Sequence, residues 1–163
     1  MNLLDKRKIA RRLEDININF YKSQDMFSYE KELIDLVNEF GYDADCLIFI
    51  ASTIKPKYAK QMPKLVLKIE EDILKLGNRG LILFANNIKW ANIDLLTKAV
   101  ADTNNINDIV EFALSVHYAK IEYLVEKLID LHAIDELNTL KRYLPFKDRK
   151  QIKRMISFKD NVL

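Results

Sequence analysis

Glycine and proline are scarce in this chain, with three of each among 163 residues. A protein built from short strands needs many tight turns, and these two residue types supply much of the turn backbone. Their scarcity argues against a meander of strands. Leu, Ile, Lys, Glu and Ala are good helix formers, so the composition predicts an all-α protein.

Cysteine and long apolar runs are lacking as well. The single cysteine, Cys46, has no partner for a disulfide within the chain, which favours a reducing compartment. It lies in the apolar run CLIFIA, where we expect a small buried side chain and not a reactive thiol. No apolar run reaches the roughly 18 residues of a membrane span, and no signal peptide is recognisable. We expect a cytoplasmic protein.

Common catalytic motifs are also missing. The sequence contains no HExxH, GxGxxG, GxxxxGK[ST], CxxC or GxSxG. We therefore expect no metal and no cofactor, and an enzyme without a recognisable motif stays the least favoured alternative.

The chemically versatile side chains show no compact cluster. His117 and His132 lie on separate predicted helices, with acids nearby at Glu111, Asp130 and Asp135, whereas metal ligands are usually spaced more closely. We expect histidines at helix ends to interact with the last carbonyls. The acidic run 70–72 is expected on a solvated helix face.

Apolar residues recur at helical spacing through the first half of the chain. Four helices are predicted, with Ser28 as a cap and Gly41 as the end of the second, Asp43 as the cap of the third, and Pro63 and Gly77 bounding the fourth. The residues expected to face inward are Ile9, Leu13, Ile16 and Phe20, then Leu33, Leu36, Val37 and Phe40, then Leu47, Ile50, Ala51 and Ile54, and finally Met62, Val66, Ile69, Ile73 and Leu76.

The second half is repetitive. Residues 84–100 and 112–128 match in residue type at a constant offset of 28, across two helices and their joint. A further offset of 28 reaches the apolar positions of 140–156, and a stretched earlier copy covers 51–59. Such hairpins bury their apolar faces by stacking on their neighbours. We predict about ten helices in a single domain of residues 1–163, with an N-terminal helix pair (1–42) followed by stacked helical hairpins (43–157) in a short α-solenoid.

Within the repeat, small and aromatic positions have expected structural roles. Ala85 and Ala113 are predicted where two helices cross closely, and the aromatic at Trp90 or Tyr118 is expected to fill the joint of a hairpin. The last copy carries lysines in place of both small residues, at 141 and 147, which is typical of a terminal repeat whose outer side faces water.

The pattern FAxxIxxAxI at 84–93, followed by an apolar second helix, resembles the short tandem helical repeats of some bacterial and viral proteins, as does MPKL at 62–65 in the earlier copy. These repeats are related to HEAT repeats and other α-solenoids, and the resemblance covers about residues 43–157. It implies a superhelical scaffold that binds other macromolecules, and it implies no catalytic residue.

Charge is strongly segregated although the net charge is only +2. Residues 1–12 contain five basic residues against one acidic, and residues 141–163 contain eight against two. The intervening chain has 13 basic and 21 acidic residues. The basic ends are read either as solvated helix faces or as contacts for an anionic partner.

Two functions are compatible with these features. The favoured one is a non-enzymatic interaction module that binds a protein with an acidic surface, as an adaptor or inhibitor. The residues expected to bind it are Lys147, Arg149, Lys150, Lys153 and Arg154, with Tyr143, Phe146 and Met155 as apolar anchors.

The alternative is nucleic-acid binding through both basic ends. The possible phosphate contacts are Lys6, Arg7, Lys8, Arg11 and Arg12, together with the basic residues of 141–154. Affinity for duplex DNA would then fall with salt at a slope near −0.9 per neutralised phosphate. The acidic middle of the chain counts against this alternative unless the two basic ends share one surface.

Overall fold

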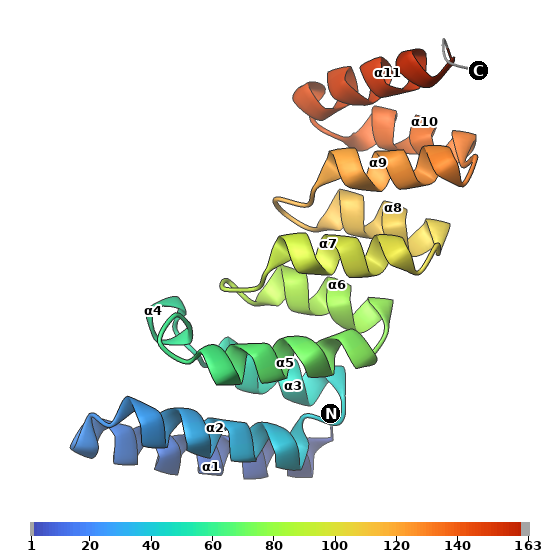
Figure 1. Cartoon of the computed structure of the whole chain (residues 1–163). Coiled ribbons are helices and arrows are strands. Elements are labelled where there is room, and N and C mark those ends of the chain that lie inside the picture. The colour runs from blue at the N-terminus through green and yellow to red at the C-terminus, as the bar shows by residue number, and fades with distance from the viewer. Residues whose placement is uncertain (1, 161–163) are drawn as a thin grey trace. The chain divides into compact units, whose positions relative to one another are not determined.

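The computed structural model describes residues 2–160, with side chains up to 157, and this part of the chain forms eleven helices and no strand (Figure 1). The helices are α1 (Leu3–Ser23), α2 (Met26–Phe40), α3 (Ala44–Ser52), α4 (Pro56–Ala59), α5 (Pro63–Lys75), α6 (Asn78–Asn87), α7 (Ile93–Asp102), α8 (Ile106–Ser115), α9 (Ile121–Asp130), α10 (Ile134–Tyr143) and α11 (Phe146–Asp160). The all-α prediction is confirmed, and the short α4 brings the expected ten helices to eleven.

Contacts between the helices divide the chain into two compact units, Met1–Ala91 with α1 to α6 and Asn92–Leu163 with α7 to α11. Within each unit, helices that follow one another in sequence pack together, except that the short α4 packs on α5 and not on α3. The sequential packing is that of a stacked helical array. A single domain over the whole chain stays a prediction.

The core of the first unit is built from the apolar stripes of its helices. α1 packs on α2, and α3 and α5 pack on α2 and on each other. All the inward positions predicted on α1, α2 and α3 are buried, as are Met62, Ile69 and Ile73, whereas Val66 and Leu76 are half-buried. Between α1 and α2, the rings of Phe20 and Tyr29 stack with centroids 4.3 Å apart. The helical period therefore predicted most of this core.

The helix ends of the first unit correct one prediction. Asp25, and not Ser28, caps α2: its carboxylate accepts hydrogen bonds from the backbone N–H groups of Phe27 (3.0 Å) and Ser28 (3.4 Å). Ser28 lies inside the first turn, where its hydroxyl donates to the same carboxylate. The predicted cap at Asp43 and the helix end at Gly41 are confirmed.

Helix positions in the second unit follow the 28-residue spacing. α7 and α9 begin 28 residues apart, as do α8 and α10, and each of these helices has ten residues. The joints repeat too, because Asn104 and His132 both have positive φ angles, 58° and 55°. This left-handed conformation reverses the chain after α7 and after α9.

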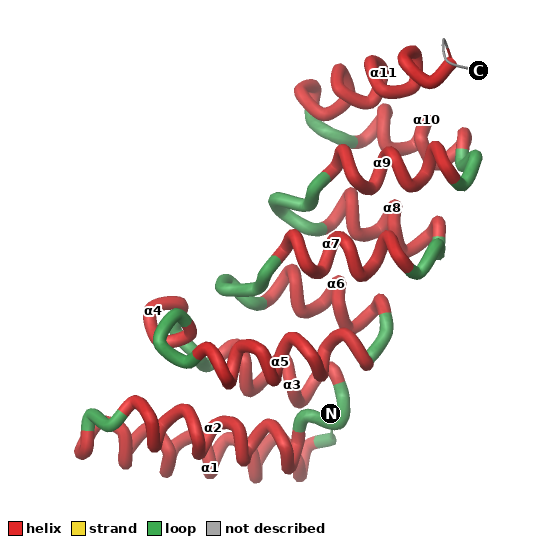
Figure 2. The backbone as a smooth tube through the Cα atoms, viewed as in Figure 1, coloured by secondary structure: helices red, strands yellow, loops and turns green. Residues whose placement is uncertain are grey.

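The joints of the second unit lie along two opposite edges. Figure 2 shows the α8–α9 and α10–α11 joints at one edge and the α7–α8 and α9–α10 joints at the other. The layer between them is apolar: Phe112, Leu124, Leu128 and Leu140 are fully buried, and Ala113 is buried as expected for a close crossing. Ala85, its counterpart in the first unit, is only half-buried.

Candidate functional site

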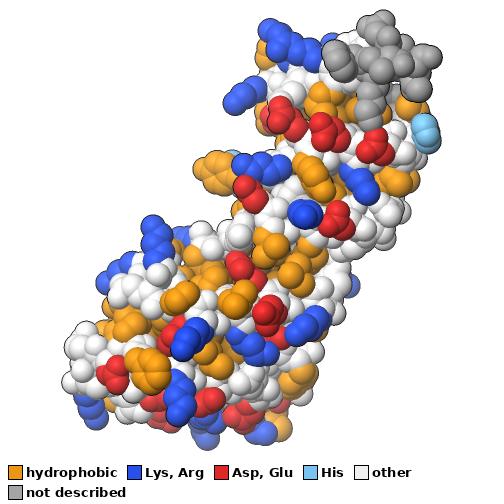
Figure 3. Space-filling model, in the orientation of Figure 1, with side chains coloured by type: hydrophobic (Ala, Val, Ile, Leu, Met, Phe, Trp, Pro, Cys, Tyr) orange, Lys and Arg blue, Asp and Glu red, His pale blue; other side chains and the backbone are white. Residues whose placement is uncertain are grey.

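The exposed face of α11 carries most of the predicted partner-binding residues. Lys147, Lys150, Lys153 and Arg154 are exposed, and their spacing places them within one side of the helix. We call these four residues the α11 basic face. Ile152, fully buried, holds the opposite side of α11 against α9 and α10. Figure 3 shows Lys and Arg side chains gathered at this end of the second unit.

Arg149 does not belong to this face. Its side chain is half-buried, and its Nε is inaccessible and has no hydrogen-bond partner. On α11, residue 149 lies between Lys153, one turn further along, and the buried Ile152, so Arg149 stands at the border between the α11 basic face and the buried side. The Nε of Arg149 is therefore not accessible to a partner, and replacing Arg149 would test folding as well as binding. A role for the rest of its guanidinium in binding stays a prediction.

Of the predicted apolar anchors, two are well exposed. Tyr143, at the end of α10, is 65% exposed, and Phe146, at the start of α11, is 75% exposed. The Arg142 guanidinium lies over the Tyr143 ring, 5.5 Å from its centroid. Met155 is half-buried and less available. Basic and aromatic side chains thus occur together near the α10–α11 joint, the combination enriched in protein interfaces.

The N-terminal basic cluster lies in the first unit, on α1, and is partly engaged. The Arg12 guanidinium forms an ion pair with Glu39 at 3.0 Å, and the Lys6 ammonium lies over the ring of Phe49. Arg7, Lys8 and Arg11 are exposed. Three of the five predicted phosphate contacts therefore remain available without breaking these interactions.

The aromatic joint position behaves differently in the two units. In the first unit Trp90 is half-buried and packs edge-to-face on Phe84, with ring centroids 5.8 Å apart. Tyr118, its counterpart in the second unit, is 80% exposed, so the expectation that it fills its joint is wrong. Its φ angle is 66°. Left-handed backbone costs a residue with a side chain roughly 1–2 kcal/mol relative to glycine, and burial offsets little of that cost here.

Next to Tyr118 the surface is hollowed. A groove of about 480 Å³ lies between residues 113–121 and residues 144–148, that is, between the α8–α9 and α10–α11 joints. Apolar side chains line much of it, among them Val116, Ile121 and Leu144. We call it the joint groove. Lys147 and Asp148 contribute opposite charges to its lining and also line an adjoining hollow of about 330 Å³.

The sequence patterns did not predict the joint groove. A usable signal was present, because Trp90, Tyr118 and Phe146 are aromatic residues at successive offsets of 28. Their spacing identifies a repeated position, but it does not tell whether the ring packs inward or projects outward.

The histidines and acids do not form a metal site. His117 is exposed, with its ring 4.0 Å from that of Tyr118, and His132 is exposed at the end of α9. Among the described residues, no group of three or more His, Cys, Asp or Glu side chains is placed to hold a metal ion.

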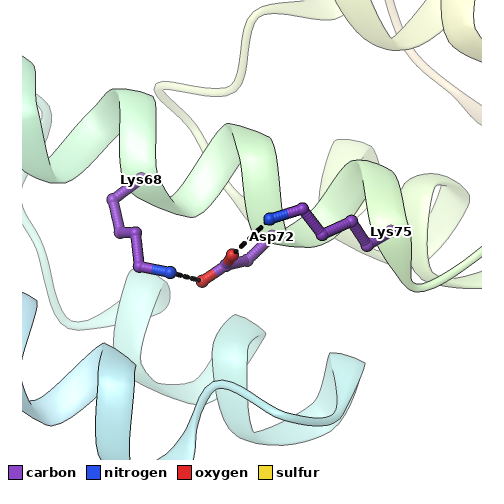
Figure 4. A network of polar contacts seen from close by, with 3 residues as sticks. All are labelled: Lys68, Asp72 and Lys75. Carbon is purple, nitrogen blue, oxygen red and sulfur yellow. Dashed lines mark hydrogen bonds and ion pairs between the residues drawn. The ribbon is translucent and has the colours of Figure 1, made fainter.

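The acidic run 70–72 is less solvated than predicted. Asp72 is half-buried and accepts from the ammonium groups of Lys68 (2.6 Å) and Lys75 (3.3 Å), as Figure 4 shows. Burial raises the pKa of Glu70, whereas Glu71 is exposed. Of these three acids, Asp72 forms helix-surface ion pairs along α5.

Cys46 is fully buried near the start of α3, which confirms its predicted role as an apolar core residue. Burial, together with the nearby Asp43 carboxylate, raises the pKa of its thiol to about 11. The nucleophilic thiolate is therefore disfavoured at neutral pH.

Two further findings bear on the class of protein. No helix within residues 2–160 combines the length and apolar character needed to cross a bilayer. Comparisons with family models, with curated proteins and with solved structures find no match to this chain.

Proposed function

We propose that this chain is a short helical-repeat scaffold, HEAT-like in its hairpins, that binds another protein as an adaptor or inhibitor. The observation that carries the proposal is the α11 basic face, four exposed cations on one side of a helix whose opposite side is buried. Within the described residues no acidic side chain forms an ion pair with these four. A protein surface rich in Asp and Glu complements such a face.

The buried side of α11 makes this assignment testable. Ile152 anchors α11 in the core, so the four cations can be changed without removing an apolar contact. Surface substitutions of this kind usually alter stability by less than about 0.5 kcal/mol.

The single cysteine further supports a reducing compartment such as the cytoplasm.

The test is a pull-down from the native cell with three forms of the full chain. One form carries Lys147→Glu, Lys150→Glu, Lys153→Glu and Arg154→Glu. A matched control carries Arg7→Glu, Lys8→Glu and Arg11→Glu on α1, and the third form is unchanged. Circular dichroism verifies that all three keep their helical content and melting temperature.

We expect a protein partner that survives nuclease treatment, is retained by the α1 variant and is lost from the α11 variant. Rising salt should weaken the complex. A partner that the folded α11 variant still binds at full affinity contradicts the proposal. Loss of all bound material on nuclease treatment would instead favour the nucleic-acid alternative, which the exposed Arg7, Lys8 and Arg11 could serve.

A further inference from the structure

Tyr118 is poorly explained by the fold alone. It combines a left-handed backbone with an 80% exposed side chain. A glycine at this position would adopt the same backbone more readily and would give up little burial. A bulky residue kept in such a conformation points to a use for its side chain outside the folding of the chain.

The position of Tyr118 suggests what that use is. Tyr118 lines the joint groove together with Val116, Ile121 and Leu144, so its ring extends the apolar lining of this groove. Phe146, 75% exposed, stands at the start of α11 beside the other lining segment. Figure 3 shows hydrophobic side chains projecting from the surface of this unit. A groove with these walls suits an apolar side chain of a partner.

The charged residues around the joint groove indicate which residues of the partner should flank that apolar side chain. Inside the groove and the adjoining hollow, the cations Lys120 and Lys147 are offset by the anions Glu122 and Asp148, and Lys120 also pairs with Asp94 at 3.3 Å. Lys147 is the shared element, because it lines the groove and also begins the α11 basic face. A chain leaving the groove past Lys147 therefore meets Lys150, Lys153 and Arg154, which form no ion pair with an acidic side chain in the part of the chain that the structure describes.

From this arrangement we infer that the joint groove and the α11 basic face form one continuous site for an extended acidic peptide segment, with an apolar residue of that segment held in the groove beside Tyr118. This inference rests on the proposed function and names the partner's recognition element. The balanced charge inside the groove favours a peptide over a nucleic acid, because each phosphate of a nucleic acid would meet Glu122 and Asp148 as well as lysines.

The experiment is selection of ligands from a random dodecapeptide library displayed on phage, against the full chain at near-physiological salt. The same selection is run against Tyr118→Gly, which removes the ring and also suits the backbone. Its melting temperature should equal or exceed that of the unchanged protein, so any loss of binding is not a loss of folding. Ile134→Ser is the matched control, since Ile134 is an exposed apolar residue (61%) at the start of α10, away from the groove lining.

Peptides enriched on the unchanged chain are then synthesised with a fluorophore and measured by anisotropy. We expect one apolar residue flanked by Asp and Glu, and an affinity at least about tenfold lower, or 1.4 kcal/mol, for both Tyr118→Gly and the charge-reversed α11 variant. Ile134→Ser should bind normally. Replacing the apolar residue of the peptide by Ala should cost as much as Tyr118→Gly.

Three outcomes would overturn the inference. Acidic peptides that bind Tyr118→Gly at full affinity would leave the α11 basic face as the binding surface, and the proposed function would stand without the groove. Failure of the selection to enrich any peptide on the unchanged chain over Tyr118→Gly would remove the groove as a peptide site. Tyr118-dependent binding of oligothymidylate, with no peptide binding, would identify a single-stranded nucleic acid as the ligand.

Discussion

Glu30, on α2, caps a helix that begins 33 residues later in the chain: its carboxylate accepts a hydrogen bond from the backbone N–H of Leu65 at 3.1 Å. The same oxygen accepts from Lys64 at 2.9 Å, and Met62, the residue at the N-cap position of α5, provides no side-chain cap of its own. Glu30 is only 8% exposed. A buried acid thus satisfies two backbone donors at the first turn of α5 and ties α2 to α5.

Replacing Glu30 by Ala should therefore lower the free energy of unfolding by about 1–3 kcal/mol, because two N–H groups lose their acceptor in a site with little access to water. Glu30→Gln keeps an acceptor oxygen and should cost less. Urea titrations followed by circular dichroism measure both. If the two variants unfold at the same urea concentration as the unchanged protein, the cap contributes nothing to stability.

A second prediction concerns the packing of the second unit. Ala101 is fully buried at the end of α7, so Ala101→Leu should overpack the layer and cost about 1–3 kcal/mol. Asn107→Leu, at an exposed position of α8, should change stability by less than about 0.5 kcal/mol. Ala113 is a poorer probe, because it lines the joint groove, into which a larger side chain could extend. Equal melting temperatures for the two leucine variants would contradict close packing at Ala101.

The left-handed residues that end α7 and α9 give a third prediction. His132→Gly should raise the free energy of unfolding by up to about 1 kcal/mol, since glycine adopts φ near 55° without steric cost. Asn104→Gly should gain only a few tenths, because asparagine tolerates this conformation. Asn138→Gly, in the middle of α10, is the matched control and should lose about 0.3 kcal/mol, because asparagine is itself a weak helix former. Thermal melts give the order of stability of the three variants. A lower melting temperature for His132→Gly than for the unchanged protein would contradict the prediction.

The fourth prediction is a pH dependence that originates at Cys46. Burial, together with the nearby Asp43 carboxylate, raises the pKa of its thiol from the ordinary 9.0 to about 11 in the folded chain. Because the folded-state pKa is raised, the stability that this thiol supports is fully present below pH 9 and is lost as pH rises toward 11.

The measurement is the difference in unfolding free energy between the unchanged protein and Cys46→Ala. We expect this difference to fall by about 1.4 kcal/mol between pH 8 and pH 10. Ellman's reagent provides a second check, because it should react slowly with the folded protein at pH 8 and quickly in denaturant. Rapid reaction of the folded chain would show that the thiol is accessible.

The sequence by itself determined the helical class, most core positions and the 28-residue spacing. These features are local: a helix has 3.6 residues per turn, so residues such as Leu33, Leu36 and Phe40 share one side whatever lies around them. The cap at Asp43 was predictable for the same reason, since its carboxylate reaches an N–H three residues ahead. The basic character of α11 was likewise readable from its residues.

Only the tertiary structure decided which side chains are free. The same repeat position holds Trp90 against Phe84 and leaves Tyr118 projecting from its joint, because the outcome depends on the neighbouring helices and on the φ angle of one residue. Arg149 stands at the border of the buried side of α11 while Lys150 faces water, although both belong to one basic run. Glu30 reaches Leu65 only because α2 and α5 pack together. Contacts between residues far apart in sequence leave no periodic signal, and these contacts shape the candidate site.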